Sequence, residues 1–319
     1  MASIENVKTQ KKGRELSCEL KDFPVSFVNA IRRILLGKIP TVVIRDVKIV
    51  ENTTRLPHEM LKHRVEMLPV NVLPHDSVTI KDAKITLHIL PSDEKMRTIT
   101  TDDFVTTPAK ILMKDQDLDT PILFLYMRND ESLHIEASLA LENEQVSQVS
   151  TATTKWHIDP ELAKKAREEH VKAENDPRLF DNFLVQRYYS RNELGRPNWI
   201  DLTVESIGVI PATELLKLSL AILKKDVADY LREALSNIQK EPDGTFYVTL
   251  EQGGHTIGYL FQETMYLNKE HVSFVSYDVT HPLRKTTVLR FNTSQSPESV
   301  LQTANDMINE YCSVVEKGL

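Results

Sequence analysis

The stretch FVNAIRRILLGKIP, residues 27–40, decides how the first part of this chain folds. At about 100° per residue, its apolar side chains gather on one side of a helix. They are Phe27, Val28, Ala30, Ile31, Ile34 and Leu35. The opposite side carries Asn29, Arg32, Arg33 and Leu36. Because an apolar arc of this width seats a helix on a core, the pattern predicts an amphipathic helix with two adjacent arginines outside.

The arginine pair has two interpretations. Exposed arginines are common on helices, so the pair can simply solvate the outer face. Alternatively, the planar guanidinium forks dock carboxylates or carbonyls of a partner. A second helix, residues 255–268, aligns with the first when Asn29 is set opposite Tyr259, and it has Gln262 and Glu263 in place of the two arginines. Because only one copy carries the pair, the comparison favours docking of a partner on that copy.

The alignment of the two helices extends into an internal repeat. The apolar positions Phe27, Ile31, Ile34 and Leu35 match Ile257, Phe261, Thr264 and Met265 in helical phase. The strand-like VVIRDV, residues 42–47, follows the first helix as FVSYDV, residues 274–279, follows the second. Each series ends in a long helix, and the apolar side chains of the first long helix are spaced by three to four: Leu216, Leu220, Leu223, Val227, Leu231, Ala234 and Ile238. We expect Ser296 to cap the second long helix.

The repeat predicts an α+β fold of two related modules that pair within one chain as a pseudo-dimer. Turn residues Pro242–Gly244 mark the boundary between the modules. The first module then comprises residues 1–71 and 197–241, and the second comprises 242–319. Residues 72–196 form a mostly β domain inserted in the first module. Its stretch SVTIKDAKITLHIL, residues 77–90, alternates as a strand does, and Asp159 is placed to cap a helix within it.

Composition narrows the range of possible functions. The 319 residues carry 39 Lys and Arg against 46 Asp and Glu, a formal charge of −7, so nothing argues for direct nucleic-acid binding. The only cysteines, Cys18 and Cys312, are far apart, which excludes a cysteine-bound zinc or iron–sulfur site and fits a reducing compartment. The sequence contains no run of about 18 apolar residues, so it predicts no membrane span. The first residues lack the apolar core of a signal peptide.

Motifs for catalysis are weak. His58 and His63 stand five apart, about 140° around a helix, whereas zinc proteases need histidines four apart. The stretch EQGGHTIG, residues 251–258, lacks the phosphate-loop pattern and reads as a turn and a helix start. The sequence shows no recognisable set of a nucleophile, a base and an acid. We therefore expect that this chain is not an enzyme and that it binds no metal. The alternative function is a stand-alone enzyme with an unrecognised active site. A third is a free pseudo-dimer that binds DNA.

Three segments carry a resemblance to a known family. Residues 28–70 closely resemble the opening of the alpha-like subunits of cellular RNA polymerases, which include the bacterial alpha amino-terminal domain and the archaeal D subunit. The matching motifs are Asn29-Ala30-Ile31-Arg32-Arg33, Glu51-Asn52-Thr53 and His63-Arg64 to Pro69. Residues 205–227 resemble the segment that closes the dimerisation half of that fold. Residues 255–293 resemble the smaller archaeal L subunit, through His255-Thr256-Ile257-Gly258, Tyr277 and His281-Pro282.

The resemblance implies a D-like half fused to an L-like half, similar to the arrangement in large nucleocytoplasmic DNA viruses. It thus implies a viral source, with the host cytoplasm (the viral factory) or the virion as location and the nucleus as the alternative. Two departures are Tyr259, where the family has Asn, and Gly253-Gly254, where acidic residues are usual.

By resemblance, the chain is a non-catalytic scaffold of DNA-directed RNA polymerase that holds the two largest subunits and a small subunit. It needs no cofactor, since Mg²⁺ and any zinc belong to other subunits. The implied docking residues for the large subunits are Asn29, Arg32, Arg33, His63 and Arg64. The implied residues of module pairing and of the core helices are Phe27, Ile31, Ile34, Leu35, Leu216, Leu220, Leu223, Val227, Ile257, Phe261 and Met265.

Overall fold

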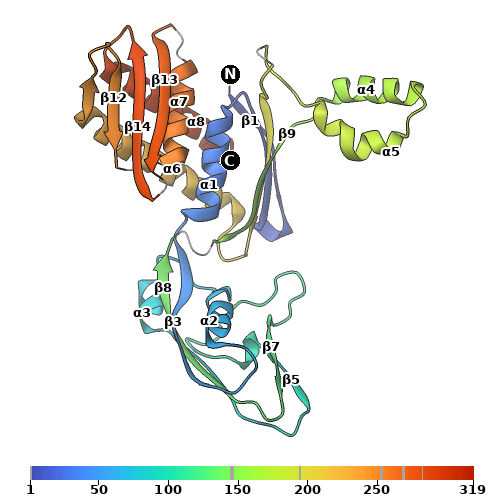
Figure 1. The fold of residues 1–319 in the computed structure, drawn as a ribbon. Helices are drawn as coiled ribbons and strands as arrows, with labels where there is room; N and C mark the ends of the chain where they lie inside the picture. The colour runs from blue at the N-terminus through green and yellow to red at the C-terminus, as the bar shows by residue number, and fades with distance from the viewer. Residues whose placement is uncertain (1, 144–146, 194, 252–253, 268–269, 282) are drawn as a thin grey trace. The chain divides into compact units, whose positions relative to one another are not determined.

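A computed structural model describes residues 2–143, 147–193, 195–251, 254–267, 270–281 and 283–319 (Figure 1). The chain divides into two compact units. The first unit contains Met1–Leu36, Thr151–Glu205 and Ala212–Leu319, and the second contains Gly37–Ser150 and Ser206–Pro211. Among the described residues, no helix has both the length and the apolar character needed to cross a membrane.

The first unit holds two four-stranded sheets of the same plan. One has the order β1 (Ser3–Gln10), β2 (Glu15–Lys21), β10 (Trp199–Ser206), β9 (Val149–Trp156). The other has the order β11 (Ile238–Lys240), β12 (Phe246–Leu250), β14 (Arg284–Thr293), β13 (Val272–His281). In each sheet the strand that leads into the first helix lies second, and the strand that leads into the long helix lies third. The internal repeat is therefore a repeat of topology.

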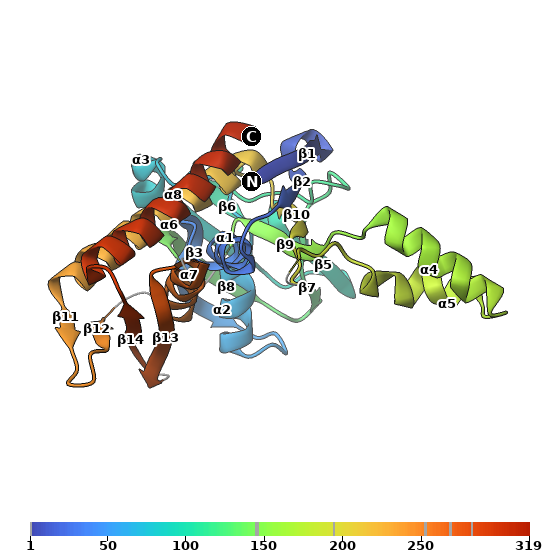
Figure 2. The same ribbon diagram turned by 90° about the horizontal axis from the view of Figure 1, so that it is seen from above.

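Helices fill the space between these sheets. They are α1 (Val25–Gly37), α6 (Ala212–Ser236), α7 (Gly254–Leu267) and α8 (Pro297–Gly318). Figure 1 shows α1 and α7 between the sheets, and Figure 2 shows α8 running beside α6. The predicted cap of α8 is confirmed, since the Ser296 hydroxyl accepts a hydrogen bond from the backbone N–H of Ser299. The paired helices give the two modules one common core.

The second unit is built mainly of strands. Its larger sheet has the order β3 (Thr41–Asn52), β8 (Leu133–Glu142), β4 (Lys84–Ile89), β6 (Val105–Thr107), and its smaller sheet pairs β5 (Met96–Thr100) with β7 (Leu123–Arg128). Helices α2 (His58–Glu66) and α3 (Ser77–Asp82) and the short helix η2 (Thr101–Asp103) complete it. Leu61 and Val65 of α2 pack into its core with Ile44, Leu87 and Ile135.

An ion pair joins two neighbouring strands of the larger sheet, β3 and β8. The Arg45 guanidinium of β3 donates two hydrogen bonds to the Glu142 carboxylate of β8, at 2.9 and 2.6 Å. These bonds favour the charged carboxylate, so the pKa of Glu142 lies below its usual range.

Two local predictions are corrected by the structure. Residues 77–82 form helix α3 rather than the start of a strand, because the Asp76 side chain caps the helix by accepting from the backbone N–H of Thr79. The strand VVIRDV lies in β3 and pairs with β8 of the second unit. In the sheet of the first module, β9 occupies the place that β13 occupies in the sheet of the second module. A β-branched run predicts a strand but leaves its partner open.

The compact units also have other bounds than the predicted domains. The second unit begins at Gly37, and residues 151–196 lie in the first unit with β9, α4 (Pro160–Lys172), α5 (Pro177–Leu179), η3 (Phe180–Leu184) and η4 (Val185–Arg187). The predicted Asp159 cap of α4 is confirmed, since its carboxylate accepts from the N–H groups of Glu161 and Leu162. The predicted module boundary at 241/242 lies inside the β11–β12 hairpin, where the Glu241 N–H bonds to the Thr245 carbonyl at 2.8 Å.

Candidate docking surface

Helix α1 separates an apolar side from a polar side. Its buried residues are Ser26, Phe27, Val28, Ala30, Ile31, Ile34 and Leu35. Asn29, Arg33 and Leu36 are exposed, and Arg32 is half-buried. Phe27 also stacks on Phe23, with ring centroids 5.4 Å apart, and both rings contact Tyr311 of α8. The apolar side thus anchors α1 to the helices of both modules and leaves the polar side in solvent.

The two arginines of α1 differ in their surroundings. The Asn29 side-chain oxygen accepts two hydrogen bonds from Arg32, from Nε at 3.2 Å and from Nη2 at 2.8 Å. One turn of helix separates the residues, which is the spacing at which side chains meet. Arg33 makes no hydrogen bond or ion pair with the described part of the chain, so its guanidinium presents all its donors to solvent. Asn29 therefore orients the Arg32 side chain, whereas the neighbouring Arg33 guanidinium has no partner among the described residues.

The other two predicted docking residues, His63 and Arg64, lie on α2 in the second unit. His63 is exposed. Arg64 donates a hydrogen bond to the backbone carbonyl of Phe124 in β7, and its guanidinium lies 5.9 Å from the centre of the Phe124 ring. Arg64 therefore fastens α2 to β7 within its own unit, a role that the sequence motif did not indicate.

The residues that replace the arginines in the second module are half-buried and hydrogen-bonded. The Gln262 side-chain oxygen accepts from the backbone N–H of Tyr277 at 2.9 Å, which ties α7 to β13. The Glu263 carboxylate accepts from the backbone N–H of Ser26 at 3.0 Å, in the first turn of α1. A carboxylate at that end of a helix satisfies an unpaired N–H and interacts favourably with the helix dipole. The second module thus uses this position to hold the first.

Each predicted core residue on these helices is buried. Phe27, Ile31, Leu35, Leu216, Leu220, Leu223, Val227 and Phe261 are fully buried, and Ile34, Ile257 and Met265 are nearly so. The sequence reasoning missed Tyr230 of α6, whose ring lies 4.5 Å from that of Phe261. Its spacing of three from Val227 was the available signal. The contact joins the long helix of the first module to α7 of the second.

The HTIG motif at the start of α7 has a steric reason. A Cβ atom on Gly258 would lie 2.8 Å from Cδ2 of Tyr277 and 3.2 Å from Cγ2 of Thr287. Glycine is therefore needed for α7 to lie close to β13 and β14. His255 Nδ1 lies 3.3 Å from the Tyr277 hydroxyl. Of the other motif residues, Gly253 and Pro282 lie outside the described residues.

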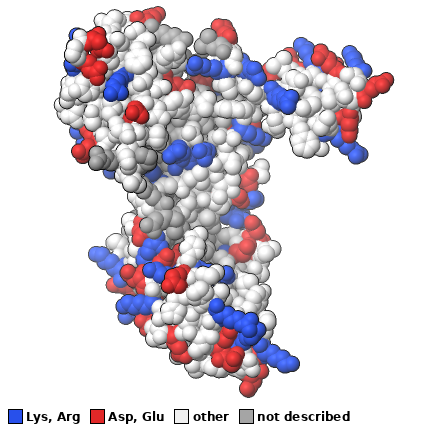
Figure 3. Space-filling model, viewed as in Figure 1, with Lys and Arg blue, Asp and Glu red and all other residues white. Residues whose placement is uncertain are grey.

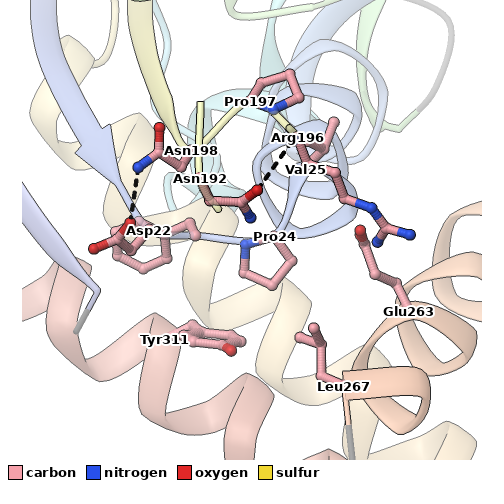
Figure 4. A pocket seen from close by; sticks show the side chains of 11 residues that line it. Asp22, Pro24, Val25, Asn192, Arg196, Pro197, Asn198, Glu263, Leu267 and Tyr311 are labelled. Carbon is pink, nitrogen blue, oxygen red and sulfur yellow. Dashed lines mark hydrogen bonds between the residues drawn. The ribbon is translucent and has the colours of Figure 1, made fainter. Parts of the chain in front are cut away.

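A pocket of about 220 Å³ opens beside the first turn of α1 (Figure 4). Figure 4 shows the side chains of Arg196 and Glu263 pointing toward each other on one side of it. Asp22 in its wall accepts a hydrogen bond from the Asn198 side chain at 3.2 Å. The residues that line the pocket include no Ser, Cys, His or Lys. The lining therefore lacks the Ser–His and Cys–His pairs that are a common basis of covalent catalysis.

Two further observations bear on chemistry and on nucleic-acid binding. Cys18 and Cys312 are free and buried, and burial raises the pKa of each thiol to about 12, so neither forms a reactive thiolate near neutral pH. Figure 3 shows Lys and Arg interspersed with Asp and Glu over the α4–α5 segment, rather than a basic stripe.

Comparison with known families identifies the fold. The model of the "RNA polymerase Rpb3/Rpb11 dimerisation domain" matches residues 17–227. A second model of the same description matches residues 245–318. The chain belongs to the Rpb3/Rpb11 dimerisation family. The predicted α+β fold with two related dimerisation modules in one chain is thereby confirmed. The first match runs from β2 into α6 and includes the second unit, and the second match covers β12 to α8.

Individual polymerase subunits are similar to this chain. The DNA-directed RNA polymerase subunit Rpo3 of Pyrococcus furiosus is 24% identical over 256 residues, which cover 73% of this chain and 98% of that protein. Rpo3 of Methanocaldococcus jannaschii is 39% identical over 74 residues, 23% of this chain and 38% of that protein. The DNA-directed RNA polymerases I and III subunit RPAC1 of Saccharomyces cerevisiae is 35% identical over 82 residues, 26% of this chain and 23% of that protein.

Proposed function

We propose that this chain is a non-catalytic assembly subunit of a DNA-directed RNA polymerase, and that it supplies both members of the dimerisation pair. The observation that carries the proposal is the presence of two Rpb3/Rpb11 dimerisation domains in one chain. The contacts of α6 with α7 and α8 support it, as do the Ser26–Glu263 bond and the Phe27–Tyr311 ring contact of α1, because they pack the modules on each other. A chain that pairs with itself offers a ready platform for larger subunits.

In this proposal, the outer face of α1 receives one of the two largest polymerase subunits. Asn29 holds Arg32 in one orientation, so little side-chain entropy is lost when a partner carboxylate or carbonyl meets it. Arg33 brings a guanidinium without competing partners in the described chain, suited to bidentate recognition. His63 is a further contact on α2, and Arg64 supports it by holding α2 to β7. The second large subunit and a small subunit bind elsewhere on the chain.

The proposal assigns the chemistry of transcription to the other subunits. The assembly role requires no catalytic residue, resident metal or cofactor in this chain, and Mg²⁺ acts on the largest subunit. It also requires no specific binding of nucleic acid by this chain alone. We further propose that the fusion of the two halves reflects a viral source, with assembly in the host cytoplasm or the virion, or else in the nucleus.

Affinity purification tests the proposal. The chain, tagged at one terminus and expressed in its native cells or in infected cells, is expected to bring down the two largest polymerase subunits in equal amounts, as identified by mass spectrometry. The isolated chain is expected to show no turnover and no steeply salt-dependent DNA binding. Recovery of the chain alone, together with a catalytic activity of its own, would favour the stand-alone enzyme instead.

A further inference from the structure

Three side chains that can bind a metal ion meet on the half-buried face of the first sheet. Glu19 of β2 stands directly opposite Asp201 of β10 in the antiparallel register. His157 immediately follows β9, the neighbour of β10. One ligand atom from each of these residues lies within 4.8 Å of the other two. None of the three belongs to the proposed docking surface or to the pocket beside α1.

The His157 ring is held in place before any ligand binds. Its backbone N–H donates to the Trp199 carbonyl at 2.9 Å, and its carbonyl accepts from the Ser190 N–H at 2.9 Å. The imidazole stacks on the Trp199 ring, with centroids 4.1 Å apart and planes 17° apart. Its Nδ1 lies 2.7 Å from Oδ1 of Asp201. The two backbone bonds and the stacking do not involve the ligand atoms, so they leave the ring little freedom to lose when an ion binds.

Glu19 carries an unsatisfied oxygen. Its Oε1 accepts a hydrogen bond from the Asn6 side chain at 2.9 Å, which orients the carboxylate. Its Oε2 is shielded from solvent and has no hydrogen-bond partner in the described part of the chain. A shielded carboxylate oxygen without a partner is costly, and it marks a place where a cation or a water is expected. This oxygen is independent evidence beyond the proximity of the three residues.

The local charge balance points the same way. Two carboxylates directly opposite each other on paired strands repel. The ammonium of Lys155 lies 3.6 Å from Oδ2 of Asp201 and offsets part of this charge, but its side chain is 69% exposed and forms no ion pair with Glu19 among the described residues. A cation shared by Glu19 and Asp201 would offset the charge of both.

We propose that Glu19, His157 and Asp201 form a reversible binding site for a divalent cation of the zinc type. One imidazole nitrogen and two carboxylate oxygens are donors that zinc accepts, with water completing its four-coordinate shell. Mg²⁺ fits less well, because it prefers an octahedral shell of oxygens and keeps its own waters. The cysteine count and the spacing of His58 and His63 predict no metal, and this site uses none of those residues. A bound ion would tie β2, β10 and the end of β9 together.

Calorimetric titration of Zn²⁺ into the chelator-treated full-length chain tests the site. We expect one ion per chain, with an affinity that Mg²⁺ in excess leaves unchanged. Glu19→Gln keeps the size of the side chain and removes its charge, and His157→Ala removes the imidazole; each is expected to weaken binding by roughly tenfold or more. Lys155→Ala removes a competing cation beside Asp201 and is expected to tighten binding, a change that a purely structural role of the cluster would not produce.

The matched control is His170→Ala on α4, which removes a half-buried imidazole whose Nε2 lies 3.1 Å from the Asp176 carbonyl oxygen. It is expected to bind Zn²⁺ as the wild type does. Thermal melts without metal verify that each variant folds, and if His157→Ala does not fold, Glu19→Gln decides. Absence of binding by the wild type, or unchanged affinity in Glu19→Gln, would overturn the proposal.

Discussion

At the scale of single residues, the polar side of α1 contains two arginines with different surroundings. Arg32 is already bonded to Asn29, whereas Arg33 is exposed and has no partner in the described part of the chain. Guanidinium groups that become buried at an interface frequently dominate its affinity. The bonds to Asn29 orient Arg32 before a partner binds. Arg33 can form the larger number of new hydrogen bonds with a partner, so it is expected to contribute more to the affinity.

The first prediction concerns Arg33. Arg33→Ala is expected to melt at the wild-type temperature, because it leaves the apolar side of α1 intact, and to weaken large-subunit binding by roughly 2 kcal/mol, about 30-fold. Arg33→Lys is expected to restore only part of the affinity, since Lys lacks the planar fork. The matched control is Arg232→Ala on α6, where the arginine is exposed and pairs only with Asp229 among the described residues. Equal recovery of the large subunits by Arg33→Ala and wild type would support the interpretation of a merely solvated face.

Helical phase alone is enough to place the residues of α1. It predicts the buried side and the outward position of Asn29 and Arg33, and these residues are indeed exposed. The same phase argument puts Gln262 and Glu263 on the outside of α7, and there the surroundings differ. Phase says which side of a helix a residue occupies, but the neighbours that meet this side come from distant parts of the chain. Neither the Tyr277 backbone nor the first turn of α1 is visible in the local sequence.

At the scale of elements, α7 of the second module caps α1 of the first through Glu263. The bond crosses between modules, so it stabilises their pairing as well as the helix. Glu263→Ala leaves the Ser26 N–H without this acceptor and is expected to destabilise the chain by about 1 kcal/mol. Glu263→Gln keeps an acceptor oxygen without the charge and is expected to lose less.

Thermal melts of the full-length chain measure this effect. Glu310→Ala is the matched control, because Glu310 is an exposed glutamate on α8 with no hydrogen bond or ion pair to the described residues. An unchanged melting temperature in Glu263→Ala would show that the bond contributes nothing to pairing.

Elements were predicted with unequal success for physical reasons. The long helix α6 has a spacing of apolar residues that persists to Ala234, and it needs no distant partner to be recognised. Ile238, which continues the predicted spacing, lies in β11 instead. Residues 77–82 alternate like a strand, yet they form a short helix because the Asp76 side chain caps its first turn. The β-branched residues of β3 predict a strand but not its sheet, because pairing with β8 depends on residues 133–142. The metal-binding cluster joins residues from three distant segments, so no sequence spacing announces it.

At the scale of the whole molecule, two dimerisation domains share one chain. Each has its own four-stranded sheet, and the helices between the sheets bury the apolar faces of both. The turn residues Pro242–Gly244 make a hairpin between β11 and β12 rather than a flexible linker, so the second module continues directly from α6. This connection favours pairing within the chain over pairing between chains, since it holds the modules at a high effective concentration.

The mass of the purified full-length chain in solution, measured by native mass spectrometry, tests this central claim most directly. If the two modules satisfy each other, the chain has no unpaired dimerisation face, and it is expected to be a monomer of 36.5 kDa at micromolar concentration. A stable species of twice that mass would contradict intramolecular pairing, because it would mean that the dimerisation faces seek a second copy of the chain.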